Sequence, residues 1–168
     1  QLTYRDAKLD AQVELDIETT DNGPGQRQLS IEGNGNVQGK PLTLSLTGEP
    51  PSQALASGAP YAVSLDAQLG KIRASFKGEA KQLPALDALQ GKLTVSAPDS
   101  AELMSFDSPA IDVPAFDFNT QLKRDGQRWA LQDMDLNTGE SHLAGSLVLE
   151  RGDTPELTAK LQGNRLDL

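Results

Sequence analysis

The chain has 168 residues, with 24 acidic and 15 basic side chains and a net charge of −9. This balance excludes the broad basic surface that nucleic-acid binding requires. The lack of cysteine excludes a disulfide framework and thiolate metal sites. A hydrophobic content of 37% with 15 glycines is typical of a folded domain. No apolar run approaches the roughly 18 residues of a membrane helix, and the first ten residues do not resemble a signal peptide.

The N-terminal third predicts strands with one apolar and one polar face. From Leu9 to Glu18, apolar and polar residues alternate without an exception, which is the two-residue period of a half-buried strand. After a break at 20–25 the alternation resumes at Leu29, and Gly33 and Gly35 predict a bulge or a sharp coil there. A turn at 39–41 leads into a strand from Leu42 to Leu46.

The middle of the chain continues this design. The segment 49–60 holds three prolines and is interpreted as a connection. Strands are predicted at 61–69 and, after Gly70, at 72–76. The segment from Leu83 to Leu89 fits either a loop or one helical turn, and a short strand is predicted around Leu93 and Val95.

One short helix is predicted at Asp99 to Phe106, where Asp99 and Glu102 have the spacing of a capping box. Prolines at 109 and 114 limit its length. The alternation then returns at 116–122, and Asp125-Gly126 predicts a hairpin turn before Trp129. The apolar parity changes between Leu131 and Met134, which predicts a bulge near 132–133.

The C-terminal stretch predicts a hairpin. Apolar residues occupy every second position in two runs, at 143–149 and at 157–161, and Arg151 to Pro155 supplies the Gly and Pro of a reversal. The whole chain is therefore expected to be a single all-β domain (1–168) of about eleven strands with one short helix, paired sequentially and antiparallel. Two facing sheets in a sandwich, a closed barrel, or a sheet curled into a hydrophobic trough would each cover or use the apolar face.

Catalytic and metal motifs are weak. Asp133 to Gly139 resembles a calcium loop, but its glycine is one position late and Ala144 stands at the twelfth position. Gly33 to Gly39 only loosely resembles a dinucleotide fingerprint, and strands rather than a helix follow it. His142 is the only histidine, and its neighbour Ser141 points to the opposite face of a strand. We therefore expect no enzyme activity, cofactor or metal.

A local basic set interrupts the acidic chain: Lys71, Arg73, Lys77 and Lys81. It fits a phosphate head group or an anionic membrane surface. The simpler interpretation, which we favour from sequence, is a solvated strand face that protects the edge of a sheet.

The C-terminal residues resemble the closing repeat of the AsmA-like proteins of the Gram-negative envelope, which are related to bridge-like lipid transfer proteins. The matching residues are Trp129-Ala130-Leu131, Leu136 to Gly145, Pro155-Glu156-Leu157 and Leu166-Asp167-Leu168. The upstream order of strand, helix, proline-rich link and hairpin agrees, so the resemblance covers about residues 28 to 168. The segment from Ser108 to Pro114 is longer and more acidic than the family pattern.

This resemblance implies a piece of a longer periplasmic protein that is held at the inner membrane by an anchor outside this chain. Its curled sheet would shield phospholipid tails on their way to the outer membrane, and the family has no catalytic residues to transfer. An alternative is a β-sandwich that binds no lipid and serves envelope assembly or adhesion; a hydrolase is the weakest reading. The candidate lipid-contacting residues are Leu15, Ile17, Leu44, Leu46, Val63, Leu65, Phe76, Phe118, Leu147 and Leu149.

Overall fold

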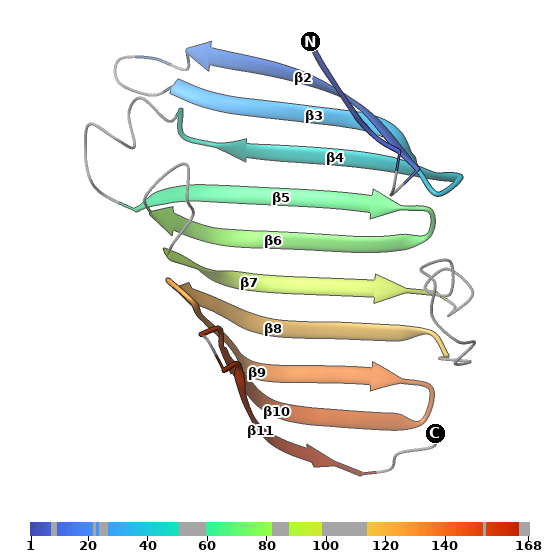
Figure 1. Cartoon of the computed structure of the whole chain (residues 1–168), viewed down its shortest axis with the longest axis vertical. Helices are drawn as coiled ribbons and strands as arrows, with labels where there is room; N and C mark the ends of the chain where they lie inside the picture. The colour runs from blue at the N-terminus through green and yellow to red at the C-terminus, as the bar shows by residue number, and fades with distance from the viewer. Residues whose placement is uncertain are drawn as a thin grey trace.

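Eleven strands form one open antiparallel sheet in the computed structural model of the chain (Figure 1). The structure describes residues 1–7, 10–21, 23, 27–50, 60–81, 88–98, 114–152 and 154–164. The order of the strands across the sheet is their order in the sequence, so each strand pairs only with its neighbours in the sequence. The predicted all-β class, sequential pairing and number of strands are confirmed for this part of the chain.

The strands are β1 (Leu2–Asp6), β2 (Ala11–Asp21), β3 (Arg27–Val37), β4 (Lys40–Gly48), β5 (Tyr61–Leu69), β6 (Ile72–Lys81), β7 (Ala88–Ala97), β8 (Phe116–Asp125), β9 (Arg128–Thr138), β10 (Ser141–Glu150) and β11 (Glu156–Gly163). No helix occurs among the residues described, and so none of them forms a helix that could cross a membrane.

Tight turns join several of these strands. Between β3 and β4, Gln38 and Gly39 both have positive φ, 51° and 76°, which is typical of the two-residue turn whose twist matches a hairpin. Gly126 has φ 57° in the turn from β8 to β9, and the hairpin predicted at Asp125-Gly126 is confirmed. Gly70 and Gly139 take positive φ in the turns that precede β6 and β10.

A bulge interrupts β9 where the change of parity predicts it. On β8, Asn119 and Gln121 face Asp135 and Gln132, so Thr120 stands opposite two residues of β9. The pairing with β10 shifts at the same place, and Asp133 has a positive φ of 50°. The extra residue restores Met134 and Leu136 to the face that Leu131 occupies.

Other predictions need correction. The bulge expected at Gly33 and Gly35 is wrong, because β3 pairs without a break with both β2 and β4. The first predicted strand is shifted, since β2 starts at Ala11 and extends to Asp21, and β1 is not predicted from the sequence at all.

Several predicted features fall partly or wholly outside the described residues, among them most of the connection at 49–60 and the motif residues Leu166-Asp167-Leu168. The helix at Asp99 to Phe106 also lies outside the described residues, as do residues 82–87, whereas Ala88 and Leu89 begin β7 as strand residues.

Few side chains are well buried. Among the described residues, the buried apolar ones are Val13, Tyr61, Phe76, Ala80, Ala97 and Ala130, and none of the large side chains is completely enclosed. All the described strands belong to one sheet, so within the described ranges no second sheet covers either face. The sheet therefore leaves much of its apolar side in partial contact with solvent.

Candidate functional site: the apolar face of the sheet

Residues that face each other on neighbouring strands share one side of the sheet, and their registers build continuous rows across it. One row carries only apolar side chains and glycine, from edge to edge. It comprises Leu2, Leu15, Gly33, Leu44, Ala67, Ala74, Val95, Phe118, Leu136, Leu143 and Gly163. We call the side of the sheet that bears this row the apolar face.

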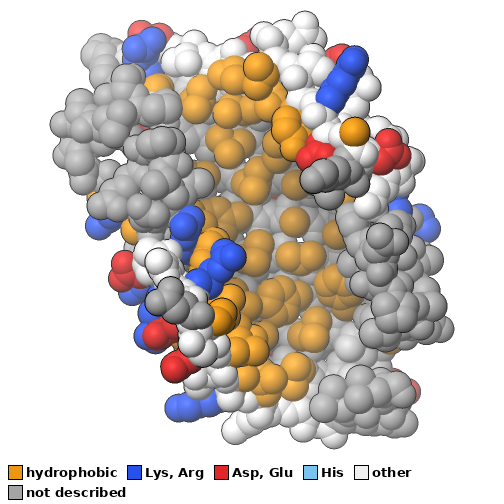
Figure 2. All heavy atoms as spheres, in the orientation of Figure 1, with side chains coloured by type: hydrophobic (Ala, Val, Ile, Leu, Met, Phe, Trp, Pro, Cys, Tyr) orange, Lys and Arg blue, Asp and Glu red, His pale blue; other side chains and the backbone are white. Residues whose placement is uncertain are grey.

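Two further rows lie beside it on the same face. One comprises Ile17, Ile31, Leu46, Leu65, Phe76, Leu93, Thr120 and, beyond the bulge, Met134, Gly145 and Leu161. The other comprises Thr19, Leu29, Gly48, Val63, Gly78, Gly91, Leu122, Leu131, Leu147 and Ala159. The paired residues of these three central rows include no charged side chain; the extra residue at the bulge, Asp133, is exposed and stands with Met134 opposite Thr120. Figure 2 shows these rows as a band of hydrophobic side chains along the sheet.

The charged residues that the register places on this face stand at strand ends. They are Asp6, Asp21, Arg27, Lys40 and Arg124. Arg124 lies 4.9 Å above the centre of the Trp129 ring, and its Nε donates to the carbonyl oxygen of Gly126 at 3.1 Å. The apolar band therefore has polar margins at the ends of the strands, where water is accessible.

The register places all ten candidate lipid-contacting residues on the apolar face. Leu15, Leu44 and Phe118 belong to the first row, and six others belong to the two rows beside it: Ile17, Leu46, Val63, Leu65, Phe76 and Leu147. Leu149 faces Trp129 and Leu157 just beyond the third row. Their exposure ranges from 6% for Phe76 to 52% for Ile17.

Glycines shape the floor of this face, and sequence reasoning did not assign them that role. A methyl group at Gly78 would lie 2.7 Å from Cζ of Phe76, and one at Gly91 would lie 2.8 Å from the same atom. The ring of Phe76 therefore packs against two facing glycines, which explains why it is only 6% exposed. A side chain at either glycine would displace the ring.

Thr120 is the one polar side chain that is buried in the described part of the apolar face. Its hydroxyl donates to the carbonyl oxygen of Gln132 at 2.8 Å, beside the bulge of β9. The bulge turns that carbonyl toward the hydroxyl, and the hydrogen bond removes the desolvation cost that an unpaired hydroxyl would carry. At the start of β5, burial raises the pKa of the Tyr61 hydroxyl.

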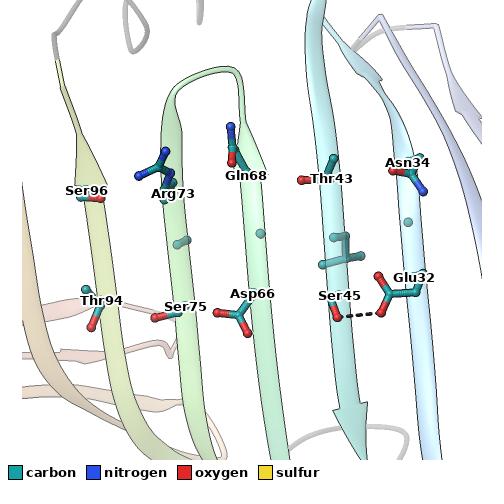
Figure 3. A pocket seen from close by; sticks show the side chains of 14 residues that line it. Glu32, Asn34, Thr43, Ser45, Asp66, Gln68, Arg73, Ser75, Thr94 and Ser96 are labelled. Carbon is teal, nitrogen blue, oxygen red and sulfur yellow. Dashed lines mark hydrogen bonds between the residues drawn. The ribbon is translucent and has the colours of Figure 1, made fainter.

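The other side of the sheet is polar and holds a shallow depression of about 510 Å³ over β3 to β7. Figure 3 shows the side chains that line it: Glu32, Asn34, Thr43, Ser45, Asp66, Gln68, Arg73, Ser75, Thr94 and Ser96. Ser45 Oγ donates to Glu32 Oε1 at 2.8 Å. The described residues include no cluster of His, Cys, Asp and Glu that could hold a metal ion.

His142 is tied to a neighbouring strand. Its Nε2 lies 2.8 Å from Asp135 Oδ2 on β9, and Asn137 Nδ2 donates to the other carboxylate oxygen at 2.5 Å. The hydrogen bond with His142 is the main cause that lowers the pKa of Asp135, and the hydrogen bond from Asn137 lowers it further. Partial desolvation of the carboxylate opposes this shift but does not reverse it. Ser141 does not complete this pair as a nucleophile would, since it lies on the apolar side of β10 and faces Thr138.

The basic set is exposed to solvent, as the simpler interpretation expects, but its role in protecting a sheet edge is wrong. Arg73, Lys77 and Lys81 belong to β6, which pairs with β5 on one side and β7 on the other, so β6 is an interior strand. The register also places Lys92 of β7 directly opposite Lys77. This cross-strand pair of like charges lies on the polar face, away from the apolar band.

Comparisons of the chain with protein-family models, with curated proteins and with solved structures found no match.

Proposed function

We propose that this chain is a segment of a periplasmic lipid conduit, in which the apolar face shields the acyl chains of phospholipids between the inner and outer membranes. The observation that carries the proposal is the set of three central rows, which cross the sheet without a charged residue. An apolar surface of this extent is rarely left to water in a monomeric protein. Acyl chains are a partner that such a smooth, mostly aliphatic surface fits.

The dimensions suit this role. Strands lie about 4.8 Å apart, so eleven of them span roughly 48 Å, which is comparable with the 40–45 Å of a whole bilayer. A lipid tail that moves across the strands would meet no charged residue among the paired positions of these rows, and its head group could stay hydrated at the margin near Arg27, Lys40 or Arg124. Movement would be passive, and no catalytic residue is required.

The resemblance to AsmA-like proteins supports the same function. Its motif residues lie on three consecutive strands: Trp129 and Leu131 on β9, Leu143 and Gly145 on β10, and Leu157 on β11. In the proposed arrangement the sheet curls into a trough with the apolar face inside, as part of a longer protein that an anchor outside this chain holds at the inner membrane. Loss of this longer protein would, in this proposal, impair the outer membrane.

Site-specific photo-crosslinking tests this proposal on adjacent residues. A benzophenone amino acid at Leu65 would lie in a central row of the apolar face, whereas at Ser64 it would lie on the polar face. Both positions are half-buried, so exposure does not distinguish them. Irradiation of cells that make the full-length protein is expected to give phospholipid adducts at Leu65 and few at Ser64.

Equal lipid labelling at the two positions would contradict a role for the apolar face. Labelling of Leu65 by protein alone would favour the alternative, an envelope assembly module without lipid.

A further inference from the structure

The outer edge of β11 has no partner strand in the described part of the chain. Every residue of β11 is exposed to solvent. Leu157 and Leu161 are 65% and 46% exposed, among the most exposed large apolar side chains described. An exposed, uninterrupted edge strand of this kind is a template for pairing with another strand.

The opposite edge of the sheet differs. On β1 the apolar side carries Asp6, which faces Ala11, and the hydroxyl of Tyr4 donates to the Asp6 carboxylate at 3.1 Å. A charge on the apolar side is one of the devices by which proteins block pairing at an edge. On β11 the same side carries only Leu157, Ala159, Leu161 and Gly163.

The backbone of β11 presents hydrogen-bonding groups outward at odd-numbered residues. The Asn164 N–H donates to the carbonyl oxygen of His142, so the even-numbered positions that continue this ladder direct their backbone groups toward β10. In an antiparallel strand the residues between them point the other way. Leu157, Ala159 and Leu161 therefore offer their N–H and C=O groups to a new partner strand.

The sequence of β11 is complementary to itself. If two copies pair antiparallel with Thr158 opposite Thr158, then Leu157 faces Ala159 and Glu156 faces Lys160 of the second copy. Each is a favourable cross-strand pair: hydroxyl with hydroxyl, apolar with apolar, acid with base. The corresponding pairing of β1 about Tyr4 would place Asp6 against Leu2.

The charges beside β11 add to this complementarity. Glu156 faces Glu150 of β10, a like-charged pair in which only Glu150 has a described cation, Arg128, at 2.5 Å. Lys160 of a second copy would reach Glu156 from its other side. The row across the joined edge would then run Arg128, Glu150, Glu156 and Lys160, with a cation at each end of the two acids.

We infer that β11 is a homodimerisation edge, at which two copies of the chain join antiparallel into one continuous sheet of twice as many strands. The two-fold axis stands perpendicular to the sheet, so both apolar faces lie on the same side. The inference rests on the edge alone and does not require that lipid binds.

Sedimentation velocity of the 168-residue chain over a concentration series tests this inference. We expect a concentration-dependent dimer for the natural sequence. Lys160→Glu turns both acid–base pairs into acid–acid pairs and should raise the dimer dissociation constant by roughly tenfold or more. The double variant Glu156→Lys with Lys160→Glu restores opposite charges and should restore the dimer, whereas Arg5→Glu on the opposite edge should change nothing.

A chain that stays monomeric at every soluble concentration would overturn the inference. So would a dimer that forms equally well with Lys160→Glu, because its copies would associate through their apolar faces or another edge. Circular dichroism melting shows whether each variant is folded. Amide hydrogen exchange gives a second readout on the natural chain: exchange at Leu157, Ala159 and Leu161 should slow as the dimer forms, and unchanged exchange in a dimer would also refute the pairing.

Discussion

Replacing Phe76 with alanine is expected to lower the free energy of unfolding by about 3 kcal/mol, the lower end of the range for removing a buried phenylalanine. Phe76 is only 6% exposed and lies between Leu65 and Leu93 in the middle of the sheet. Its ring also covers Gly78 and Gly91, which have no side chain to fill the space that it would leave. Urea denaturation followed by circular dichroism measures the change.

Leu2→Ala is the matched control, since it removes a large side chain from the same face at a position that is 56% exposed. It should cost well under about 1 kcal/mol, because little contact is lost. Equal losses for the two variants would mean that the contacts around Phe76 do not form the core of this sheet.

The second prediction with a large effect concerns phospholipid binding rather than the stability of the fold. Leu44→Asp places a carboxylate in the row that crosses the whole sheet, between Gly33 and Ala67. Leu44 is half-buried, so the carboxylate can stay hydrated and the fold should survive. Phospholipid binding should weaken roughly 100-fold. Acyl chains that contact this position would have to desolvate the carboxylate, and a charged side chain in hydrocarbon costs about 3 kcal/mol.

Thr43→Asp is the control for this variant. Thr43 is the preceding residue of β4, and its side chain lies on the polar face (Figure 3). It should leave both thermal unfolding and lipid binding near those of the natural chain. If Leu44→Asp unfolds the chain, the apolar face is a packed core as in a sandwich; if it changes neither property, this face does not bind lipid.

Much of the fold follows from local pattern. The unbroken alternation in β2 and β5 fixes which side of each strand is apolar, since a slip of one residue would invert every side chain. The bulge in β9 could be predicted because Leu131 and Met134 keep one face only if an extra residue is inserted. By contrast β1 was missed, because it has only five residues and Asp6 ends its alternation.

The composition of a single strand does not show its place in the sheet. The basic residues of β6 have the composition of an edge strand, yet β6 is flanked on both sides. Gly33 and Gly35 suggest a bulge, but their function is close approach: a methyl group at Gly33 would meet Leu15 at 2.9 Å and Leu44 at 3.1 Å. Such contacts between strands depend on register, as does the pairing of His142 with Asp135.

Only part of the candidate site could be predicted, because its other features depend on the register between strands. Alternation identified ten residues as members of an apolar side, and the register places all of them on one face. It could not identify the rows that they form, the glycines that complete those rows, or the charges at the margins. These features arise only when neighbouring strands are aligned.

The central claim, that the apolar face holds phospholipid tails, is tested most directly by native mass spectrometry of the chain purified without detergent from envelope extracts. We predict adducts with the masses of phospholipids on the natural chain and on Thr43→Asp, and their loss on Leu44→Asp. A natural chain that is folded and free of lipid in this measurement would contradict the claim.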